Sequence, residues 1–159
     1  MAIGGAEDRA GARRILRHFY TLAGGDDARL VVIPTASEDR QGAGQMHLDI
    51  FQSFGAATVE ILPVFNRQDA IEPAHLAPLQ AATGIFLVGG NQLRFSALLG
   101  GTPLAQAIRR ANAAGVLIGG TSAGAMNTIA VLSSLRPADD RLADLFADLL
   151  ALRAVPAVG

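Results

Sequence analysis

Short runs of apolar residues alternate along this chain with longer segments whose apolar residues recur at helical spacing. The short runs are bounded by glycine, proline or polar residues, which is typical of strands buried on both faces. Such alternation predicts βαβ units, in which helices join parallel strands and cover both faces of their sheet. The expected fold class is therefore α/β, a three-layer sandwich with a mostly parallel sheet.

The expected elements can be placed along the chain. Strands are predicted at residues 1–3, 30–33, 58–62, 85–88 and 116–118. Helices are predicted at residues 10–22, 46–54, 74–81, 93–99 and 103–114. The residues from 35 to 44 are expected to form a polar loop, and Thr102-Pro103 to be an N-cap followed by a proline at the first helical position.

Composition narrows the function classes. The 159 residues suit a single domain, and the absence of cysteine excludes disulfides, thiolate zinc sites and cysteine nucleophiles. The 13 basic residues are all arginine and face 14 acidic ones, so no excess of positive charge indicates a nucleic-acid or membrane-surface partner. No apolar run approaches the ~18 residues of a membrane span, and no signal peptide is recognised. A soluble protein of the cytoplasm is expected.

Nucleotide and metal sites are not indicated by the sequence. A phosphate-binding Walker loop needs lysine, which this chain lacks, and its only Gly-x-Gly, at Gly42 and Gly44, has His47 where the dinucleotide motif needs a third glycine. His47 and Asp49 are two residues apart on a predicted helix, so they point in different directions. No cofactor and no metal are expected.

One glycine-rich turn has the pattern of a nucleophile elbow. Residues 120–124 fit G-x-S-x-G, lie after a predicted strand and precede a predicted helix, which is the setting in which such a turn exposes a serine hydroxyl. Ser122 is then the candidate nucleophile, and the N–H of Ala123 can donate to a developing oxyanion. An N-capping serine is the alternative interpretation.

The order of the motifs resembles that of cyanophycinases. The motifs are Gly4-Gly5-Ala6-Glu7-Asp8, Val32-Ile33-Pro34-Thr35-Ala36-Ser37, Gly89-Gly90-Asn91-Gln92-Leu93-Arg94, Gly100-Gly101-Thr102-Pro103-Leu104 and Gly119-Gly120-Thr121-Ser122-Ala123-Gly124-Ala125. Cyanophycinases belong with the aspartyl dipeptidases (peptidase E) in a serine-peptidase family. The resemblance implies a flavodoxin-like fold similar to the class I glutamine amidotransferase domain, and it covers residues 1–130.

The resemblance also implies a reaction and a set of site residues. Cyanophycinases hydrolyse cyanophycin, a poly-aspartate with arginine on each β-carboxyl, and release β-Asp-Arg dipeptides. Ser122 matches the family nucleophile, while the backbones of Ala123 and of Gly90 or Asn91 match the oxyanion region. Gln92 matches a substrate-binding glutamine, and Asn91 stands where the family usually has aspartate.

The catalytic base is the main departure from the family pattern. Family members carry their histidine after the serine, in an Asp-Gln-His-Phe segment, whereas the histidines of this chain are His18, His47 and His75. A serine without a base is a poor nucleophile, so weak or absent peptidase activity is expected. His47 is the best substitute among the three, against its alternative as a plain surface histidine.

Two domain-level expectations concern the C-terminal residues. Residues 131–159 are expected to be a divergent tail with an amphipathic helix at 140–152, packed on the domain formed by 1–130. A C-terminal truncation, by a gene fragment or a frameshift, would explain the missing histidine segment.

The alternative function is a non-catalytic domain that binds a peptide or small amide near Gly90 and Gln92. Oligomeric state stays open, with a homodimer as one option.

Overall fold

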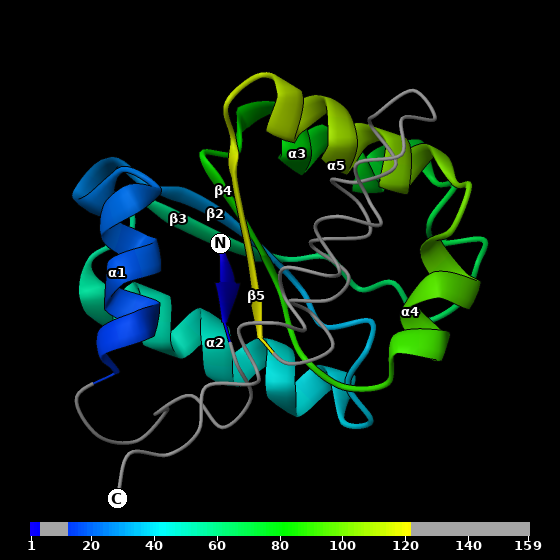
Figure 1. Cartoon of the computed structure of the whole chain (residues 1–159), viewed down its shortest axis with the longest axis horizontal. Helices are drawn as coiled ribbons and strands as arrows, with labels where there is room; N and C mark the ends of the chain where they lie inside the picture. The colour runs from blue at the N-terminus through cyan, green and yellow to red at the C-terminus, as the bar shows by residue number, and fades with distance from the viewer. Residues whose placement is uncertain (4–12, 122–159) are drawn as a thin grey trace, which may run out of the picture.

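The sheet has five parallel strands. A computed structural model of the chain describes residues 1–3 and 13–121 (Figure 1). The strands are β1 Ala2–Ile3, β2 Arg29–Ile33, β3 Thr58–Ile61, β4 Gly84–Leu87 and β5 Leu117–Thr121. They are hydrogen-bonded in the order β1-β5-β4-β2-β3, and every pair is parallel. The predicted α/β class is confirmed.

Helices cover both faces of this sheet. They are α1 Arg14–Leu22, α2 Arg40–Phe54, α3 Ala77–Ala81, α4 Gln92–Leu99 and α5 Pro103–Ala113, with 3-10 turns η1 Gly25–Asp27 and η2 Pro73–His75. The buried residues of α1 and α2 pack with one set of strand residues, and those of α3, α4 and α5 pack with another. Figure 1 shows the two groups of helices on opposite sides of the strands. The three-layer sandwich is therefore confirmed.

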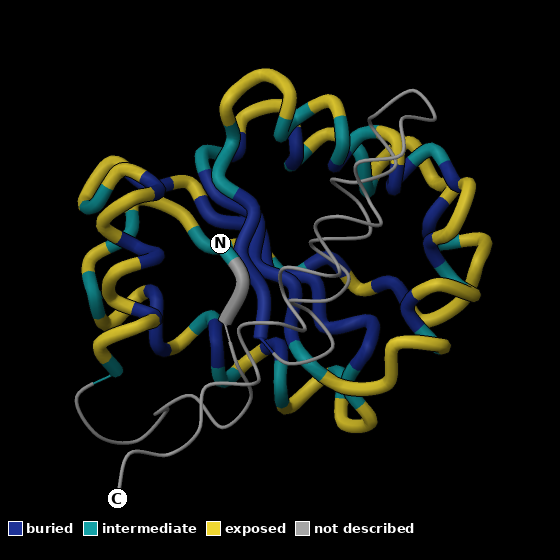
Figure 2. Tube along the Cα trace, viewed as in Figure 1, coloured by how far each residue is buried: buried dark blue, intermediate teal, exposed yellow. Residues whose placement is uncertain are grey.

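Alternating strand residues divide the core into two clusters. In β2, Leu30 and Val32 pack with α1 and α2, whereas Val31 and Ile33 pack with the helices of the opposite face. All four are at most 3% exposed, so β2 is buried on both sides, as its unbroken apolar sequence predicts. Figure 2 shows buried strands running through the middle of the molecule, with exposed positions on the outer helices.

The connections reverse direction between β2 and β4. After β2 the chain enters α2 and continues to β3 on one side, whereas after β4 it enters α4 on the opposite face and continues to β5 on the other side. At such a reversal α/β proteins bind ligands outside the carboxyl ends of the two strands, and this region between β2 and β4 is called the crevice below. This arrangement matches the flavodoxin-like order, with β1 added at the β5 edge.

The prediction of a loop up to residue 44 was wrong for its last part. The helix α2 begins at Arg40, because Asp39 caps it by accepting the N–H of Gly42 at 2.8 Å. Gly44 lies inside the helix, where a Cβ would be 3.1 Å from a methyl carbon of Ile61. Here glycine allows close packing of α2 on the sheet and does not break the helix.

Two other element boundaries also differ from the predictions. Strand β5 continues past residue 118 to Thr121, because Gly119 lets it pass beneath the ring of Phe19, with 2.6 Å between an added Cβ and that ring. The helix α1 begins at Arg14, because Arg13 has a left-handed backbone with φ 48°, and residues 10–12 of the predicted helix lie outside the described residues. The predicted tail helix at 140–152 and its packing lie outside the described residues.

Candidate functional site

The crevice between β2 and β4 brings two of the sequence motifs together. The loop after β2 contains Ala36, and the turn after β4 contains Gly90 and Asn91. The N–H of Asn91 donates to the Ala36 carbonyl at 2.7 Å. Gly90 has φ 154°, and a Cβ added to it would lie 2.0 Å from the same oxygen, so only glycine fits there. The two loops therefore approach each other at backbone distance.

This contact separates the two candidate oxyanion donors. The N–H of Asn91 is occupied by Ala36, whereas the N–H of Gly90 makes no hydrogen bond to any residue that the structure describes. Gly90 is exposed at the carboxyl edge of the sheet. Of the two amides, that of Gly90 is therefore the one available to a substrate oxygen.

The candidate substrate-binding residues lie at the start of α4. The side-chain oxygen of Asn91 accepts the N–H of Arg94 at 3.1 Å and so caps the helix. Gln92, the first residue of α4, is exposed. The side-chain oxygen of Asn91 thus has a structural task, whereas the side chain of Gln92 is exposed two residues after Gly90.

Two buried threonine hydroxyls flank β4 at the same edge of the sheet. Thr35 follows β2 and Thr121 ends β5, and both are 0% exposed. Neither hydroxyl has a hydrogen-bond partner within residues 1–3 and 13–121. Buried hydroxyls are nearly always hydrogen-bonded, so these two polar atoms mark the carboxyl ends of β2 and β5 as places for a polar ligand or water.

Strand β5 leads directly into the predicted nucleophile elbow. Gly120 is paired with Leu87 of β4 and with Ala2 of β1, and Thr121 ends the strand. The residue after Thr121 is Ser122, so the order of strand and serine is that of an elbow. Ser122 and Ala123 themselves lie outside the described residues.

His47 is a core residue and not the plain surface histidine of the alternative interpretation. It is 0% exposed on the inner side of α2, and its ring lies 5.1 Å from that of Phe86. Its Nδ1 is 2.8 Å from the carbonyl of Ala43, which can only accept, so Nδ1 carries the proton. With the proton on Nδ1, Nε2 is the ring nitrogen that can carry a lone pair, as in the base of a serine triad.

The other two histidines lie away from the crevice. His18 is exposed on α1. His75 has its Nδ1 2.7 Å from the carbonyl of Asp69, in the loop between β3 and α3. The side chain of Asp69 accepts the N–H of Phe65 at 2.7 Å and that of Asn66 at 3.0 Å, and the bond from Phe65 is the main reason that the pKa of this carboxyl lies below its usual value.

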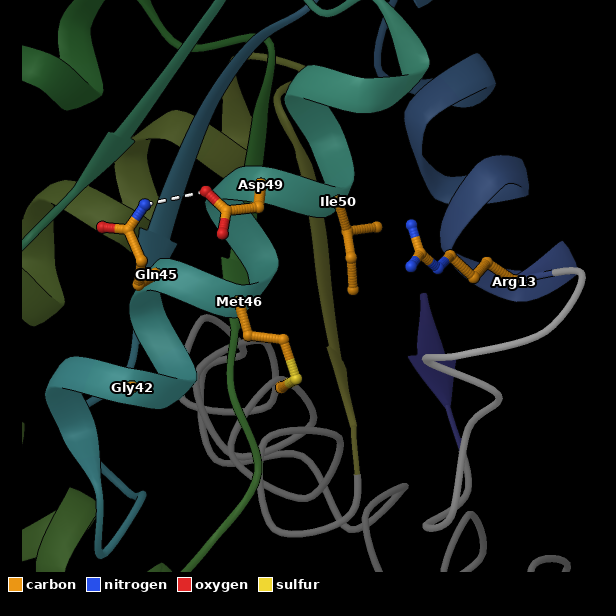
Figure 3. A pocket seen from close by; sticks show the side chains of 6 residues that line it. All are labelled: Arg13, Gly42, Gln45, Met46, Asp49 and Ile50. Carbon is orange, nitrogen blue, oxygen red and sulfur yellow. Dashed lines mark hydrogen bonds between the residues drawn. The ribbon is translucent and has the colours of Figure 1, made fainter.

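A separate pocket of about 430 Å³ lies between the start of α1 and residues 42–50 of α2 (Figure 3). Its polar lining comes from Arg13, Gln45 and Asp49. Gln45 donates to the Asp49 carboxylate at 2.8 Å, and Figure 3 shows the two side chains facing each other while Arg13 points toward Ile50.

In the described part of the chain, no group of three or more histidine, aspartate or glutamate side chains is placed to hold a metal ion. Likewise, none of its helices is long and apolar enough to cross a membrane.

The comparison with known proteins gives one family and several relatives. The model of peptidase family S51 matches residues 1–156, which is further than the motifs alone extend. The cyanophycinase of Synechococcus elongatus is 49% identical over 126 residues, covering 79% of this chain and 39% of the relative. That of Trichormus variabilis is 41% identical over 126 residues, covering 79% and 42%. The chain therefore spans less than half the length of these relatives.

A solved structure supports the same fold. A peptidase from an acI-B1 actinobacterium superposes with a TM-score of 0.66 at 26% identity, over 77% of this chain and 52% of that one. The fold of this chain is thus that of a known peptidase structure over most of its length.

Proposed function

Because this chain belongs to peptidase family S51, we propose that it contributes the nucleophile and the oxyanion donors of a cyanophycinase-like serine peptidase. The observation that carries the proposal is the crevice between β2 and β4, where the Gly90 N–H is left without a partner among the described residues. The expected substrate is cyanophycin or a related aspartyl peptide.

The proposed chemistry is acyl transfer to Ser122. Its Oγ attacks the scissile carbonyl carbon, and the N–H groups of Gly90 and Ala123 donate hydrogen bonds to the resulting oxyanion. The proton of Ser122 passes to a base and from there to the leaving amine. Gln92 is proposed to hold the substrate, and Asn91 to contribute the free N–H₂ of its side-chain amide.

The base is the weak point of a polypeptide with these 159 residues. His18 and His75 lie away from the crevice, and His47 is buried under Phe86 although its tautomer suits a base. We therefore expect slow turnover. Loss of a triad member commonly lowers the rate by about three or more orders of magnitude.

A fluorophosphonate probe and a hydrolysis assay test the proposal together. The purified 159-residue polypeptide should be labelled slowly at Ser122, should release β-Asp-Arg from cyanophycin only weakly, and should lose both reactions in Ser122→Ala. Ser96→Ala, at an exposed position on α4, is the matched control and should behave as wild type.

Three outcomes would revise the proposal. Labelling that survives Ser122→Ala would exclude Ser122 as nucleophile. Rapid β-Asp-Arg release would contradict the expected weak activity, and its loss in His47→Gln would then assign the base. An unlabelled protein that still binds a β-Asp-Arg dipeptide, measured by calorimetry, would favour the binding domain over the enzyme. The cytoplasmic location, the homodimer and the lack of a nucleic-acid partner stay predictions.

A further inference from the structure

One arginine links the two loops that meet in the crevice. Nη1 of Arg94, a half-buried residue of α4, donates to the carbonyl of Ser37 at 2.9 Å and to that of Ala36 at 3.3 Å. The backbone N–H of Arg94 donates to Asn91 Oδ1 at 3.1 Å. Arg94 therefore contacts the loop after β2 with its side chain and the turn after β4 with its backbone.

The Ala36 carbonyl is the point where these contacts converge. It accepts the N–H of Asn91 at 2.7 Å and Nη1 of Arg94 at 3.3 Å, and it lies where a Cβ of Gly90 would be. A bond from a charged donor is stronger than one from a neutral amide, so the guanidinium helps to fix this oxygen. The position of the Ala36 carbonyl oxygen determines that it accepts the N–H of Asn91 and not that of Gly90.

The two glycines of the turn after β4 do not by themselves restrict its backbone to one conformation. Gly89 and Gly90 both lack a Cβ, so a wide range of backbone angles is open to them, including rotations of the peptide that would turn the Gly90 N–H away. A defined direction for this N–H must be imposed from outside the turn. The contacts from Ala36 and Arg94 are the ones that do so within the described residues.

We infer that Arg94 is a positioning residue for the oxyanion amide: by holding the Ala36 carbonyl against the Asn91 N–H, it keeps the Gly90 N–H directed to the substrate. The inference rests on the proposed function, because it gives the Gly90 N–H its role. The sequence motif containing Arg94 gave no sign of this task, since only the folded chain brings α4 against the loop after β2.

Hydrogen exchange at the Asn91 amide tests the structural part without any need for activity. In Arg94→Met, which keeps an unbranched apolar side chain but has no donors, exchange at Asn91 should be about 10-fold or more faster than in wild type. Arg94→Lys retains a charged donor and should restore part of the protection. Far-UV circular dichroism should be the same for all variants.

The matched control is another arginine that donates to two carbonyls. Arg67 donates to Ala97 and Gly100, both at 2.9 Å, away from the turn after β4. Arg67→Met removes the same number of guanidinium bonds and should leave exchange at Asn91 unchanged. Equal acceleration in both variants would show a general loss of stability and would overturn the inference.

Labelling of Ser122 by a fluorophosphonate tests the functional part. In Arg94→Met the maximal labelling rate should fall about 10-fold with little change in the half-saturating probe concentration, because the oxyanion donor matters in the transition state. Unchanged exchange at Asn91, or faster exchange with an unchanged labelling rate, would overturn the inference. A wild-type protein that is never labelled would instead contradict the proposed function, so the two failures are distinguishable.

Discussion

The two faces of the sheet are packed in different ways. Against α1 and α2 the core is built of rings: Phe19 lies 5.2 Å from Phe86 and 5.6 Å from Phe51, and the His47 ring lies 5.1 Å from that of Phe86, tilted by 35°. Against α3, α4 and α5 the core is mostly aliphatic. Its buried strand residues are Val31, Ile33, Ile85, Leu87 and Ile118. One face therefore depends on ring geometry, the other mainly on filled volume.

Glycines in the strands make the ring face possible. A Cβ on Gly84 would lie 2.8 Å from both Ala23 and Leu30, and a Cβ on Gly119 would lie 2.6 Å from the ring of Phe19. Real Cβ atoms do not approach this closely, so neither site accepts alanine without movement of a neighbour. The packing of the face that carries α1 and α2 therefore depends on the exact shapes of its side chains, and this face should tolerate fewer substitutions.

The largest expected effect comes from removing a ring. Phe19 and Leu104 are both 0% exposed, one on each face. Phe19→Ala should lower the free energy of unfolding by about 3–5 kcal/mol, and Leu104→Ala by about 2–4 kcal/mol, because the ring leaves a larger cavity. Urea denaturation of both variants measures the difference. A larger loss of unfolding free energy in Leu104→Ala than in Phe19→Ala would contradict the expected difference between the two faces.

A smaller effect is expected from adding one methyl group beneath that ring. Gly119→Ala should cost about 1–3 kcal/mol by overpacking against Phe19. Combining it with Phe19→Leu, which removes the clashing ring carbons, should recover part of that loss, and a double-mutant cycle in urea measures this coupling. Strictly additive losses of unfolding free energy in the two single variants and the double variant would show that the methyl group added by Gly119→Ala does not contact Phe19.

The smallest expected effects are changes of stability with pH, which differ in direction between the two faces. The hydroxyl of Tyr20, on α1, donates to Asp26, and this bond is the main reason that the pKa of Tyr20 is raised. Asp69 lies in the loop that leads to the aliphatic face, and its pKa is lowered mainly by the Phe65 N–H. The contribution of the Tyr20 bond to the free energy of unfolding is therefore complete below the ordinary pKa of tyrosine, and it is lost as the pH rises through the raised pKa. The contribution of the Asp69 bonds is complete above the ordinary pKa of aspartate, and it is lost as the pH falls through the lowered pKa.

Two conservative variants measure these pH effects. The difference in unfolding free energy between wild type and Tyr20→Phe should shrink at alkaline pH, and that between wild type and Asp69→Asn should shrink at acid pH. Both changes should be small, because the Asp69 bonds are exposed and the Tyr20–Asp26 bond is only partly buried. A Tyr20→Phe difference that stays constant up to strongly alkaline pH would contradict the assignment.

The sheet could be predicted from the sequence because its strands are strongly patterned. The run from Leu30 to Ile33 is apolar without a break, and the Thr102-Pro103 pair marks a helix start that the structure confirms, with the Thr102 hydroxyl accepting the Ala105 N–H at 3.3 Å. Glycine was the source of error. Gly44 and Gly119 resemble turn residues in sequence, but their neighbours in space, Ile61 and Phe19, explain why they are glycine.

The site was only partly predictable for a similar reason. Gly90 and Asn91 were found as a motif, yet their different tasks depend on Ala36, which is more than 50 residues away and contacts them only in the folded chain. Arg94 was missed altogether, since an arginine in the first turn of a helix is ordinarily a solvated residue. Burial of His47 was also missed, because one polar residue on a helix carries no sign of which face it occupies.

The position of β1 has a consequence for the order in which the chain folds during synthesis. Among the described strands this one pairs with β5 alone, and the Met1 amino group donates to the carbonyl of Ile118, 117 residues away in sequence. The strands β2, β3 and β4 can pair as soon as each has left the ribosome, whereas β1 must wait for β5. Ala2 and Ile3 thus precede the other described strands in the chain but are among the last of them to be paired, and the strand that leads to Ser122 lacks this neighbour until then.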